Sequence, residues 1–480
     1  MRAHPAGPRF GEILAPAGAP AAPVDVEAMH ALDPVVWPST AVRSTGDALE
    51  QRAVTIAGID VRDLAAEHGT PLYVLDELDF RARAAAFRDA YADPEVPTDV
   101  FYAGKAFLST IVARWVEEEG LGLDVCTGGE ILTAVRAGFP AARMAFHGNN
   151  KSVAELELAL DHGIGRYVVD SFEEIVRLAA AAEARGVVAD VLVRVTVGVE
   201  AHTHEFIATA HEDQKFGLSL SGGQAEEAVR RILKLPSLRL VGLHSHIGSQ
   251  IFDTAGFEVS AHRLVALAGK VRDEHGLEVA ELDLGGGMGI AYGSDDDPMT
   301  AKEMAELLRG IVVRECRALG LAVPRIAVEP GRAIVGPSMV TVYEVGTVKQ
   351  VDLGNGHVRH YVGVDGGMSD NIRTALYDAE YTVRLVSRVS ESAPVLARVV
   401  GKHCESGDIV VRDCWLPGDL APGDLLGVAA TGAYCRAMAS NYNHVPRPPV
   451  ISVRDGVSRV VVRRETPDDL LALDAGLESD

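Results

Sequence analysis

The sequence predicts an α/β protein in which a (β/α)8 barrel is followed by a β domain of antiparallel strands. Between residues 99 and 336, short apolar and β-branched runs alternate with Ala-, Leu- and Glu-rich helical stretches in eight successive units. The runs are continuously apolar, as in a parallel sheet that is buried on both faces. After residue 336 apolar and polar residues alternate instead, which is typical of half-exposed antiparallel strands. The length of the first region suits a barrel of typically ~250 residues.

The eight predicted barrel strands follow one another in a regular order. They read TDVFYAGK (98–105), LGLDVCTGG (121–129), RMAFHGNN (143–150), GRYVVDS (165–171), DVLVRVTVG (190–198), RLVGLHSHIGS (239–249), ELDLGGGMG (281–289) and RIAVEPGR (325–332). Amphipathic helices are predicted at 154–162, 172–184, 223–233 and 304–319. A doubly wound open sheet is the alternative architecture. It would require a Gly-rich turn after the first strand, and the sequence has none there.

The rest of the chain divides into three predicted parts. Residues 1–30 are rich in Ala and Pro and predict a flexible tail, and 31–74 form an N-terminal segment that adds a strand or two to the β domain. The predicted barrel comprises residues 75–336 and is expected to bind a cofactor. The predicted C-terminal β domain comprises residues 337–480. Its strands are predicted within 339–351, 357–367, 381–389, 394–402, 408–417 and 424–434.

Composition excludes several classes of partner. The chain has 45 Lys and Arg against 68 Asp and Glu, a net charge of −23, and it shows no basic patch. Nucleic acid and anionic membranes are therefore not expected as partners. The five cysteines show no CxxC pair and no zinc-ligand spacing, which suits reduced thiols in a cytosol. No apolar run is long enough to span a bilayer, so we expect a soluble, cytoplasmic protein.

Function in such barrels collects where the strands end, and Lys105 closes the first strand. Flanked by Tyr102 and Phe107, it is poorly placed for solvation, and burial would lower the pKa of its amine. A lysine of that kind can bond covalently to an aldehyde. Taken alone, a surface salt bridge at the rim is the simpler interpretation.

The seventh and eighth strands end in residues suited to an anion. The seventh ends in three glycines that include Gly286 and Gly287, whose backbone N–H groups could close on a phosphate. The eighth ends with Glu329 and Arg332. Phosphate sites in these barrels usually form from the loops after these two strands.

Two groups of histidines need separate interpretations. His244 and His246 end the sixth strand, where they could ligate a metal with Asp124, or one imidazole could stack on a flat ligand while Ser249 helps to bind its phosphate. Stacking is favoured, because the rim offers no obvious further metal ligands. A polar loop after the fifth strand is predicted to be a solvated surface loop, and it contains His202, His204 and His211.

A lysine, a phosphate cradle, a stacking histidine and an acidic residue together suggest pyridoxal phosphate. The residues then become recognisable. The chain resembles the alanine-racemase-like barrel enzymes that use this cofactor, and within them the actinobacterial diaminopimelate decarboxylases. The matching segments run in order from residue 101 to 443: FYAGKAF, DVCTGGE, HGNNKS, GLHSHIGSQ, DLGGGMGI, EPGRAIVG, DGGMSDNIRTALY, CESGD and GAY…SNYN.

The resemblance implies a role for each matching residue and no metal. Lys105 would hold the cofactor, His246 would stack on its ring and Glu329 would pair with the pyridine nitrogen. The other implied cofactor contacts are Asp124, Ser249, Gly286, Gly287, Arg332 and Tyr434. The implied substrate contacts are Arg332, Arg373, Tyr377, Glu405 and Tyr434.

Cys404 and Glu405 are implied to enter the active site from the partner subunit of a head-to-tail homodimer. Cys404 would protonate the product carbanion, directly or through a water. Related decarboxylases of basic amino acids have a shorter or non-acidic residue after this cysteine, so Glu405 favours meso-diaminopimelate, decarboxylated to L-lysine in the last step of lysine biosynthesis. The alternatives are a decarboxylase of ornithine, arginine or carboxynorspermidine, a catalytically silent homologue, and a metal-dependent barrel hydrolase that uses His244 and His246.

Overall fold

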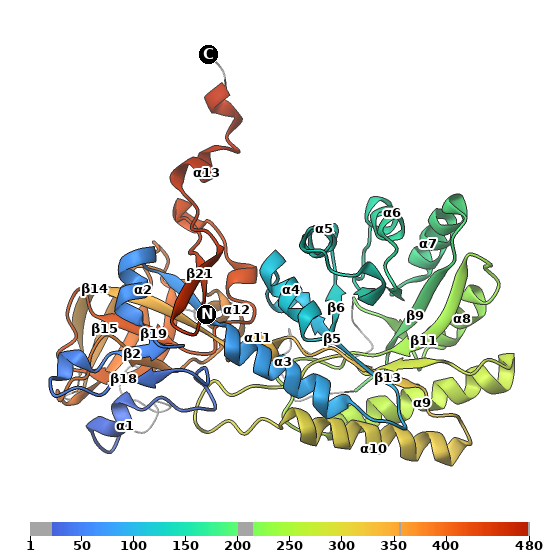
Figure 1. The fold of residues 1–480 in the computed structure, drawn as a ribbon, viewed down its shortest axis with the longest axis horizontal. Coiled ribbons are helices and arrows are strands. Elements are labelled where there is room, and N and C mark those ends of the chain that lie inside the picture. The colour runs from blue at the N-terminus through green and yellow to red at the C-terminus, as the bar shows by residue number, and fades with distance from the viewer. Residues whose placement is uncertain (1–21, 200–214, 355–356, 479–480) are drawn as a thin grey trace. The chain divides into compact units, whose positions relative to one another are not determined.

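A computed structural model describes residues 22–199, 215–354 and 357–478 of the protein. The chain forms two units (Figure 1). The barrel unit comprises Arg81–Gly289 and Asp297–Ile334. The β unit comprises the described residues within Met1–Phe80, Ile290–Asp296 and Val335–Asp480.

The barrel unit contains a closed ring of eight parallel strands, so the predicted (β/α)8 barrel is confirmed. Each strand pairs with the next, and the last pairs with the first, Ile326 lying opposite Thr98. The short strand β10 (Leu218–Ser219) extends the sheet beside the fifth barrel strand. The eight strands of the ring are β5 (Thr98–Ala103), β6 (Gly122–Val125), β7 (Met144–Phe146), β8 (Arg166–Val169), β9 (Ala189–Thr196), β11 (Leu238–His244), β12 (Glu281–Asp283) and β13 (Arg325–Val328).

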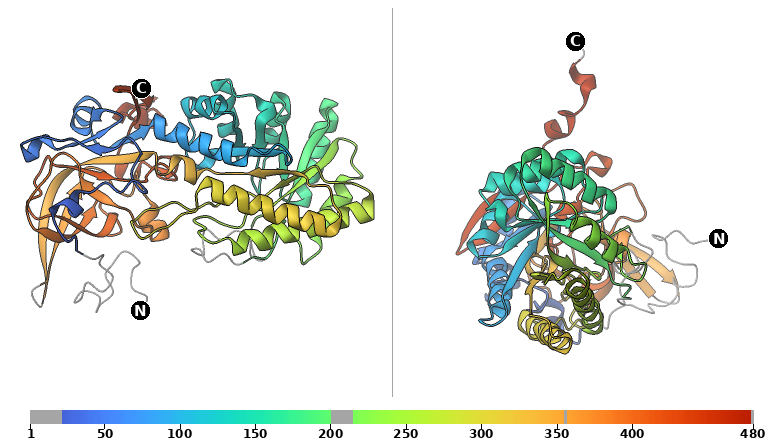
Figure 2. Two further views of the ribbon diagram at one scale, coloured as in Figure 1. Left: turned by 60° about the horizontal axis from the view of Figure 1, so that its bottom comes forward. Right: turned by 90° about the vertical axis from the view of Figure 1, so that its right-hand side faces the viewer.

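Helices surround these strands, as the view along the barrel in Figure 2 shows. Their ends follow from the sequence: Ser152 and Glu155 form a capping box at the start of α6, and Gly163 ends that helix in the left-handed conformation. All four predicted helices are present, and the interior is filled by side chains such as Phe101, Ala145 and Ala327. The main helices of this region are α3 (Glu77–Tyr91), α4 (Thr110–Glu118), α5 (Gly128–Ala137), α6 (Val153–His162), α7 (Phe172–Arg185), α8 (Gln224–Ile232), α9 (Ala255–His275) and α10 (Ala301–Leu319).

The β unit is built on a nine-stranded sheet that is mixed, not purely antiparallel. β15 pairs with β17, and β4 with β20, in parallel, whereas the other pairs are antiparallel. Alternation shows only that one face of a strand is exposed, and a half-exposed strand can also have a parallel neighbour in a mixed sheet, so the pattern did not reveal these two pairs. The strands are β4 (Leu72–Asp76), β14 (Met339–Gly354), β15 (His357–Val364), β16 (Val383–Leu385), β17 (Pro394–Val400), β18 (Ile409–Pro417), β19 (Leu425–Val428), β20 (Val450–Arg454) and β21 (Val457–Val462).

Three segments differ from the predicted boundaries. Part of the predicted tail 1–30 is the helix α1 (Val26–His30), with Met29 and His30 buried, while residues 1–21 lie outside the described part. β1 (Val42–Arg43), β2 (Val54–Ile56) and β3 (Ile59–Asp60) form a separate three-stranded sheet. Ile290–Asp296, predicted to belong to the barrel, joins the β unit, where the Thr382 hydroxyl donates to the Tyr292 carbonyl at 2.7 Å.

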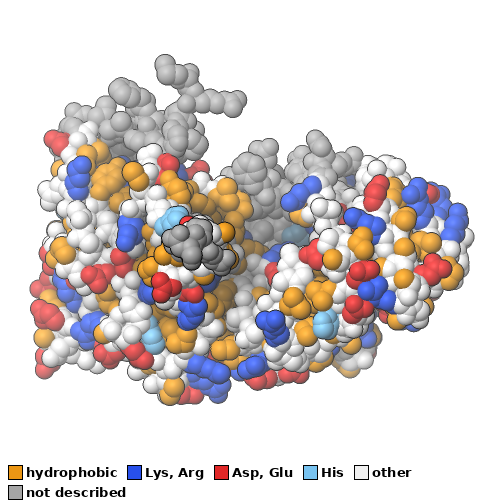
Figure 3. Space-filling view, turned by 90° about the horizontal axis from the view of Figure 1, so that it is seen from above, with side chains coloured by type: hydrophobic (Ala, Val, Ile, Leu, Met, Phe, Trp, Pro, Cys, Tyr) orange, Lys and Arg blue, Asp and Glu red, His pale blue; other side chains and the backbone are white. Residues whose placement is uncertain are grey.

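The surface is charged with both signs. Acidic and basic side chains are interspersed with hydrophobic ones over the face in Figure 3. Within the part of the chain that the structure describes, no helix has both the length and the apolar character required to cross a membrane.

Candidate functional site

Polar side chains meet at the carboxyl ends of the barrel strands. Lys105 follows β5 in a short 3-10 turn, Gly104–Ala106, and its side chain is exposed. The prediction that Tyr102 and Phe107 would bury it is therefore wrong, although those two side chains are themselves buried. Burial raises the pKa of Asp124 at the end of β6, and the charge of Lys105 opposes part of that rise, so the two groups act on each other.

Glu329, directly after β13, is 3% exposed and is contacted by two histidines. Its Oε1 lies 3.0 Å from His147 Nε2 and 3.3 Å from His244 Nε2. Burial opposes ionisation, but the two imidazoles hold the pKa of Glu329 well below its usual range. Burial and the nearby Glu329 raise the pKa of Asp283, which ends β12, well above its usual range. Of this carboxyl pair, Glu329 is the one that stays ionised.

His147, in HGNNKS, was given no role by the sequence reasoning. Its position in the sequence could have indicated a role, because His147 directly follows the third barrel strand, just as Lys105 lies at the end of the first. Its role depends on Glu329 and Asp124, which are remote in sequence; Asp124 Oδ1 lies 3.6 Å from His147 Nε2.

The glycines after β12 let neighbouring backbone segments of the rim pack closely against one another. An added Cβ on Gly286 would collide with the Glu329 carbonyl oxygen, and Gly287 has φ +108 and faces the Gly248 carbonyl. The N–H of Gly286 donates to His246 Nδ1 at 3.1 Å, so His246 lies beside the cradle. Burial lowers the pKa of His246 well below its usual value, which leaves a neutral ring.

A polar pair lies at the same rim, with Ser249 after β11 and Arg332 at the start of the short helix α11 (Arg332–Val335). Arg332 Nη2 donates to Ser249 Oγ at 2.9 Å, and the arginine is buried. The structure thus brings together the glycine cradle and its neighbouring histidine. It also brings together a hydroxyl and a guanidinium in the segments that follow β11 and β13. This is the donor set that a phosphate requires.

The remaining candidate residues belong to the β unit. Arg373 begins α12 (Arg373–Tyr377), is buried, and donates to the hydroxyls of Tyr292 at 2.8 Å and Tyr381 at 2.5 Å. Neither tyrosine was singled out from the sequence, since nothing in YGSDDD or AEYTV marks them. They hold the guanidinium in one orientation.

Cys404 and Glu405 lie in the loop between β17 and β18. The thiol is exposed, and the backbone N–H of Cys404 donates to Asn443 Oδ1 at 3.1 Å. Glu405 Oε1 accepts from the Gly407 N–H at 3.2 Å and is half-buried. Tyr377 is half-buried at the end of α12, and Tyr434 is a half-buried residue with φ 62.

The rim fits pyridoxal phosphate on its own chemistry. A buried ionised carboxylate matches a pyridinium nitrogen, and the cradle matches a phosphate. By spacing alone His147, His244 and Glu329 could also hold a metal ion, their ligand atoms lying within 4.8 Å of one another. The predicted pair His244 and His246 does not form that cluster, because β11 ends at His244 and His246 lies beside Gly286. His202, His204 and His211 lie outside the described residues.

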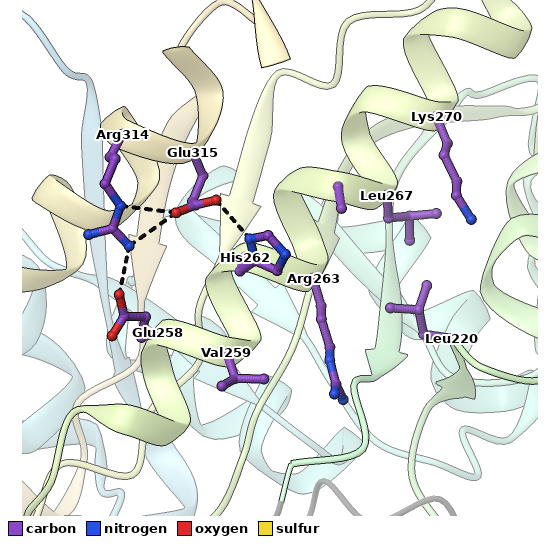
Figure 4. Close-up of a pocket in the computed structure, with 10 residues that line it drawn as sticks. Leu220, Glu258, Val259, His262, Arg263, Leu267, Lys270, Arg314 and Glu315 are labelled. Atoms are coloured by element: carbon purple, nitrogen blue, oxygen red, sulfur yellow. Dashed lines mark hydrogen bonds and ion pairs between the residues drawn. The ribbon is translucent and has the colours of Figure 1, made fainter. Parts of the chain in front are cut away.

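A groove elsewhere on the barrel unit is lined by α9 and α10 (Figure 4). Four of its charged side chains pair with one another: Arg314 lies 2.7 Å from Glu258, and His262 lies 2.7 Å from Glu315. Such pairs satisfy their own charges on a solvated surface. We therefore place the functional site at the strand ends.

Comparison with known proteins agrees with the chemistry of the rim. Residues 77–336 match the family described as pyridoxal-dependent decarboxylase, pyridoxal binding domain. The chain is 55% identical over 478 residues to the diaminopimelate decarboxylase of Mycobacterium leprae, with 99% of this chain and 100% of the relative covered. It is 58% identical over 452 residues to that of Mycobacterium tuberculosis, covering 93% and 99%.

Solved structures give the same result for the fold. A diaminopimelate decarboxylase from M. jannaschii in complex with L-lysine superimposes with a TM-score of 0.82 at 29% identity, covering 91% of this chain and 98% of that one. The enzyme from Helicobacter pylori, also complexed with L-lysine, gives a TM-score of 0.78 at 29% identity, covering 87% and 100%.

Proposed function

The chain belongs to the diaminopimelate decarboxylase family of pyridoxal-dependent decarboxylases, and we propose that it converts meso-2,6-diaminopimelate into L-lysine and CO2. It is thus a carboxy-lyase, and its product is the end product of lysine biosynthesis. The observation that carries the proposal is the buried, ionised Glu329 beside the glycine cradle at the barrel rim. Near-complete alignment with relatives of this name supports the substrate.

The rim residues would hold the cofactor from several sides. Pyridoxal phosphate supplies an electron sink that accepts the electron pair left when CO2 departs. The Lys105 amine would bind the cofactor aldehyde, and Glu329 would keep the pyridine nitrogen protonated. The ring would lie against His246, and Asp124 would contact the cofactor at the same rim. The phosphate would lie at the Gly286–Gly287 turn, with donors from the side chains of Ser249, Arg332 and Tyr434.

The β unit would supply the substrate contacts. Arg373, already oriented by Tyr292 and Tyr381, would bind the carboxylate that is retained, together with Tyr377. Arg332 and Tyr434 are further substrate contacts in this proposal. A fixed guanidinium loses little side-chain entropy when the substrate binds, which supports this role.

We further propose a cytoplasmic homodimer in which each site is completed by the partner subunit. The partner's Cys404 would deliver the proton to the carbon that has lost CO2. The partner's Glu405 would bind the distal ammonium of the substrate. The exposure of the thiol supports this assignment, because a group that acts on another subunit's substrate has to be accessible. Neither nucleic acid nor a membrane is a partner in this proposal.

The direct test is product analysis with competing substrates. The purified protein, saturated with pyridoxal phosphate, is incubated separately with meso-diaminopimelate, ornithine, arginine and carboxynorspermidine. We expect CO2 and L-lysine in equal amounts from diaminopimelate and little CO2 from the others. The Lys105→Ala variant is the control and should release none. A higher kcat/KM for ornithine or arginine would contradict the proposed substrate.

A further inference from the structure

The carboxylate of Glu329 is held between histidines from two different strands. His147 follows β7, His244 ends β11, and they are 4% and 1% exposed. Both Nε2 atoms approach the same oxygen, Oε1, at 3.0 and 3.3 Å. The two rings meet edge to face, with centroids 5.0 Å apart. This arrangement fixes the carboxylate from two directions.

His147 is itself held firmly on both sides. Its backbone N–H donates to the Val125 carbonyl at 2.8 Å, which ties it to β6. The carbonyl of the next residue, Gly148, accepts from Lys151 Nζ at 2.8 Å. The same ammonium donates to the Val168 carbonyl at 2.8 Å and to Glu174 at 2.7 Å, so it anchors this loop to β8 and α7. The backbone that carries the imidazole is therefore tied to β6, β8 and α7.

The charges around Glu329 favour the binding of a cationic group. Burial lowers the pKa of His244 to about 4, so this ring is neutral at neutral pH. Burial and the neighbouring Glu329 raise the pKa of Asp283, so Glu329 is the more acidic of these two carboxyl groups. Glu329 therefore keeps its negative charge for a ligand.

We propose that His147 is a positioning residue that fixes the Glu329 carboxylate for the pyridinium nitrogen of the cofactor. This inference rests on the proposed function, which assigns Glu329 to that nitrogen. His147 touches neither cofactor nor substrate in this scheme and acts only through Glu329. Removing its N–H donor leaves a buried carboxylate with one contact fewer, which weakens its pairing with a cationic ring.

The same three side chains could instead bind a divalent metal, since two histidines and a carboxylate are common zinc ligands. The family match and the adjacent glycine cradle favour the cofactor. Metal binding is therefore one outcome of the test.

The test compares His147→Gln with His147→Leu. Glutamine keeps an N–H donor near the position of Nε2, whereas leucine fills similar space without one. The matched control is His262→Leu, which removes another histidine–carboxylate pair, the 2.7 Å contact with Glu315 on the outer groove (Figure 4). Each apoprotein is checked for folding by circular dichroism and then titrated with pyridoxal phosphate. The bound cofactor's visible spectrum is recorded, and kcat and KM are measured.

We expect His147→Leu to weaken cofactor binding by about 10- to 100-fold, as for a lost hydrogen bond to a charged group. Its visible spectrum should shift, and kcat should fall more than KM rises. His147→Gln should recover most of the affinity, and His262→Leu should match the wild type. Failure of the proposed function is separately visible, because the wild type would then bind no cofactor or release no CO2, and the inference would fall with it.

Three results would overturn the inference in an active wild type. One is unchanged cofactor affinity and spectrum in His147→Leu. Another is a folded His147→Gln variant that is as impaired as His147→Leu. The third is a zinc site: the wild-type apoprotein contains one equivalent of Zn²⁺, and the His147→Leu variant lacks this zinc but binds the cofactor with unchanged affinity.

Discussion

At the scale of single residues, the site is a set of charges that the barrel rim keeps in unusual states. Glu329 stays ionised although it is buried, whereas burial and the neighbouring Glu329 raise the pKa of Asp283 well above its usual range. His244 and His246 stay neutral because burial penalises their charged forms. These states are maintained by the protein's own contacts, so titration of these side chains should reveal them in the protein without cofactor.

His244 gives a prediction for stability against pH. Its pKa is lowered to about 4 in the folded protein, against 6.5 for an unperturbed histidine. The unfolded chain therefore binds a proton below pH 6.5 that the folded chain refuses until about pH 4, and stability falls as pH falls through this window. Between pH 8 and 4.5 the wild type should lose about 2–3 kcal/mol of its free energy of unfolding through His244. The His244→Gln variant should not show this part of the loss. Urea denaturation at several pH values measures it, and parallel curves for the two proteins would contradict the assignment.

At the scale of elements, strand ends position every rim group. The sequence predicted Lys105 and Glu329 at the rim because barrel strands buried on both faces appear as continuous apolar runs, which locates their ends. It could not predict the exposure of Lys105, which depends on the turn after β5. It could not predict the clamp on Arg373 either, because Tyr292 and Tyr381 come from segments far apart in the chain.

The buried pair Lys151–Glu174 gives a prediction for the loop that carries His147. The Lys151 side chain is fully buried, and its Nζ lies 2.7 Å from Glu174 Oε1. Lys151→Met leaves a carboxylate buried without its partner and should lower the free energy of unfolding by about 3–5 kcal/mol. The double variant Lys151→Met/Glu174→Leu should lose less, because no lone charge remains. Urea denaturation of the variants checks this, and simple addition of the two single losses would rule out coupling.

At the scale of the whole molecule, the proposed function places each active site between two subunits. The strand pattern predicted both units. It did not predict the two parallel strand pairs of the mixed sheet, because segments remote in sequence determine which strands pair. The dimer likewise rests on residues such as Cys404, whose exposure suits a role outside its own subunit.

Mixed dimers test the shared site. Lys105→Ala and Cys404→Ala should each be nearly inactive as homodimers, the second with a larger effect on kcat than on KM. In a mixed dimer one site combines an intact lysine with an intact cysteine, so a statistical mixture should recover about a quarter of the wild-type activity. Coexpression with two different tags and measurement of CO2 release give the result. A Cys404→Ala homodimer with near-normal kcat, or no recovery on mixing, would disprove the shared site.

The central claim is that the barrel rim holds pyridoxal phosphate through Lys105, and peptide mass spectrometry tests it most directly. The holoenzyme is reduced with borohydride, which makes the bond between amine and cofactor permanent, and is then digested. We predict the added mass of the cofactor on the peptide that contains Lys105 and on no other. Labelling of Lys151, the buried lysine of the same rim, or the absence of any labelled peptide, would contradict the account.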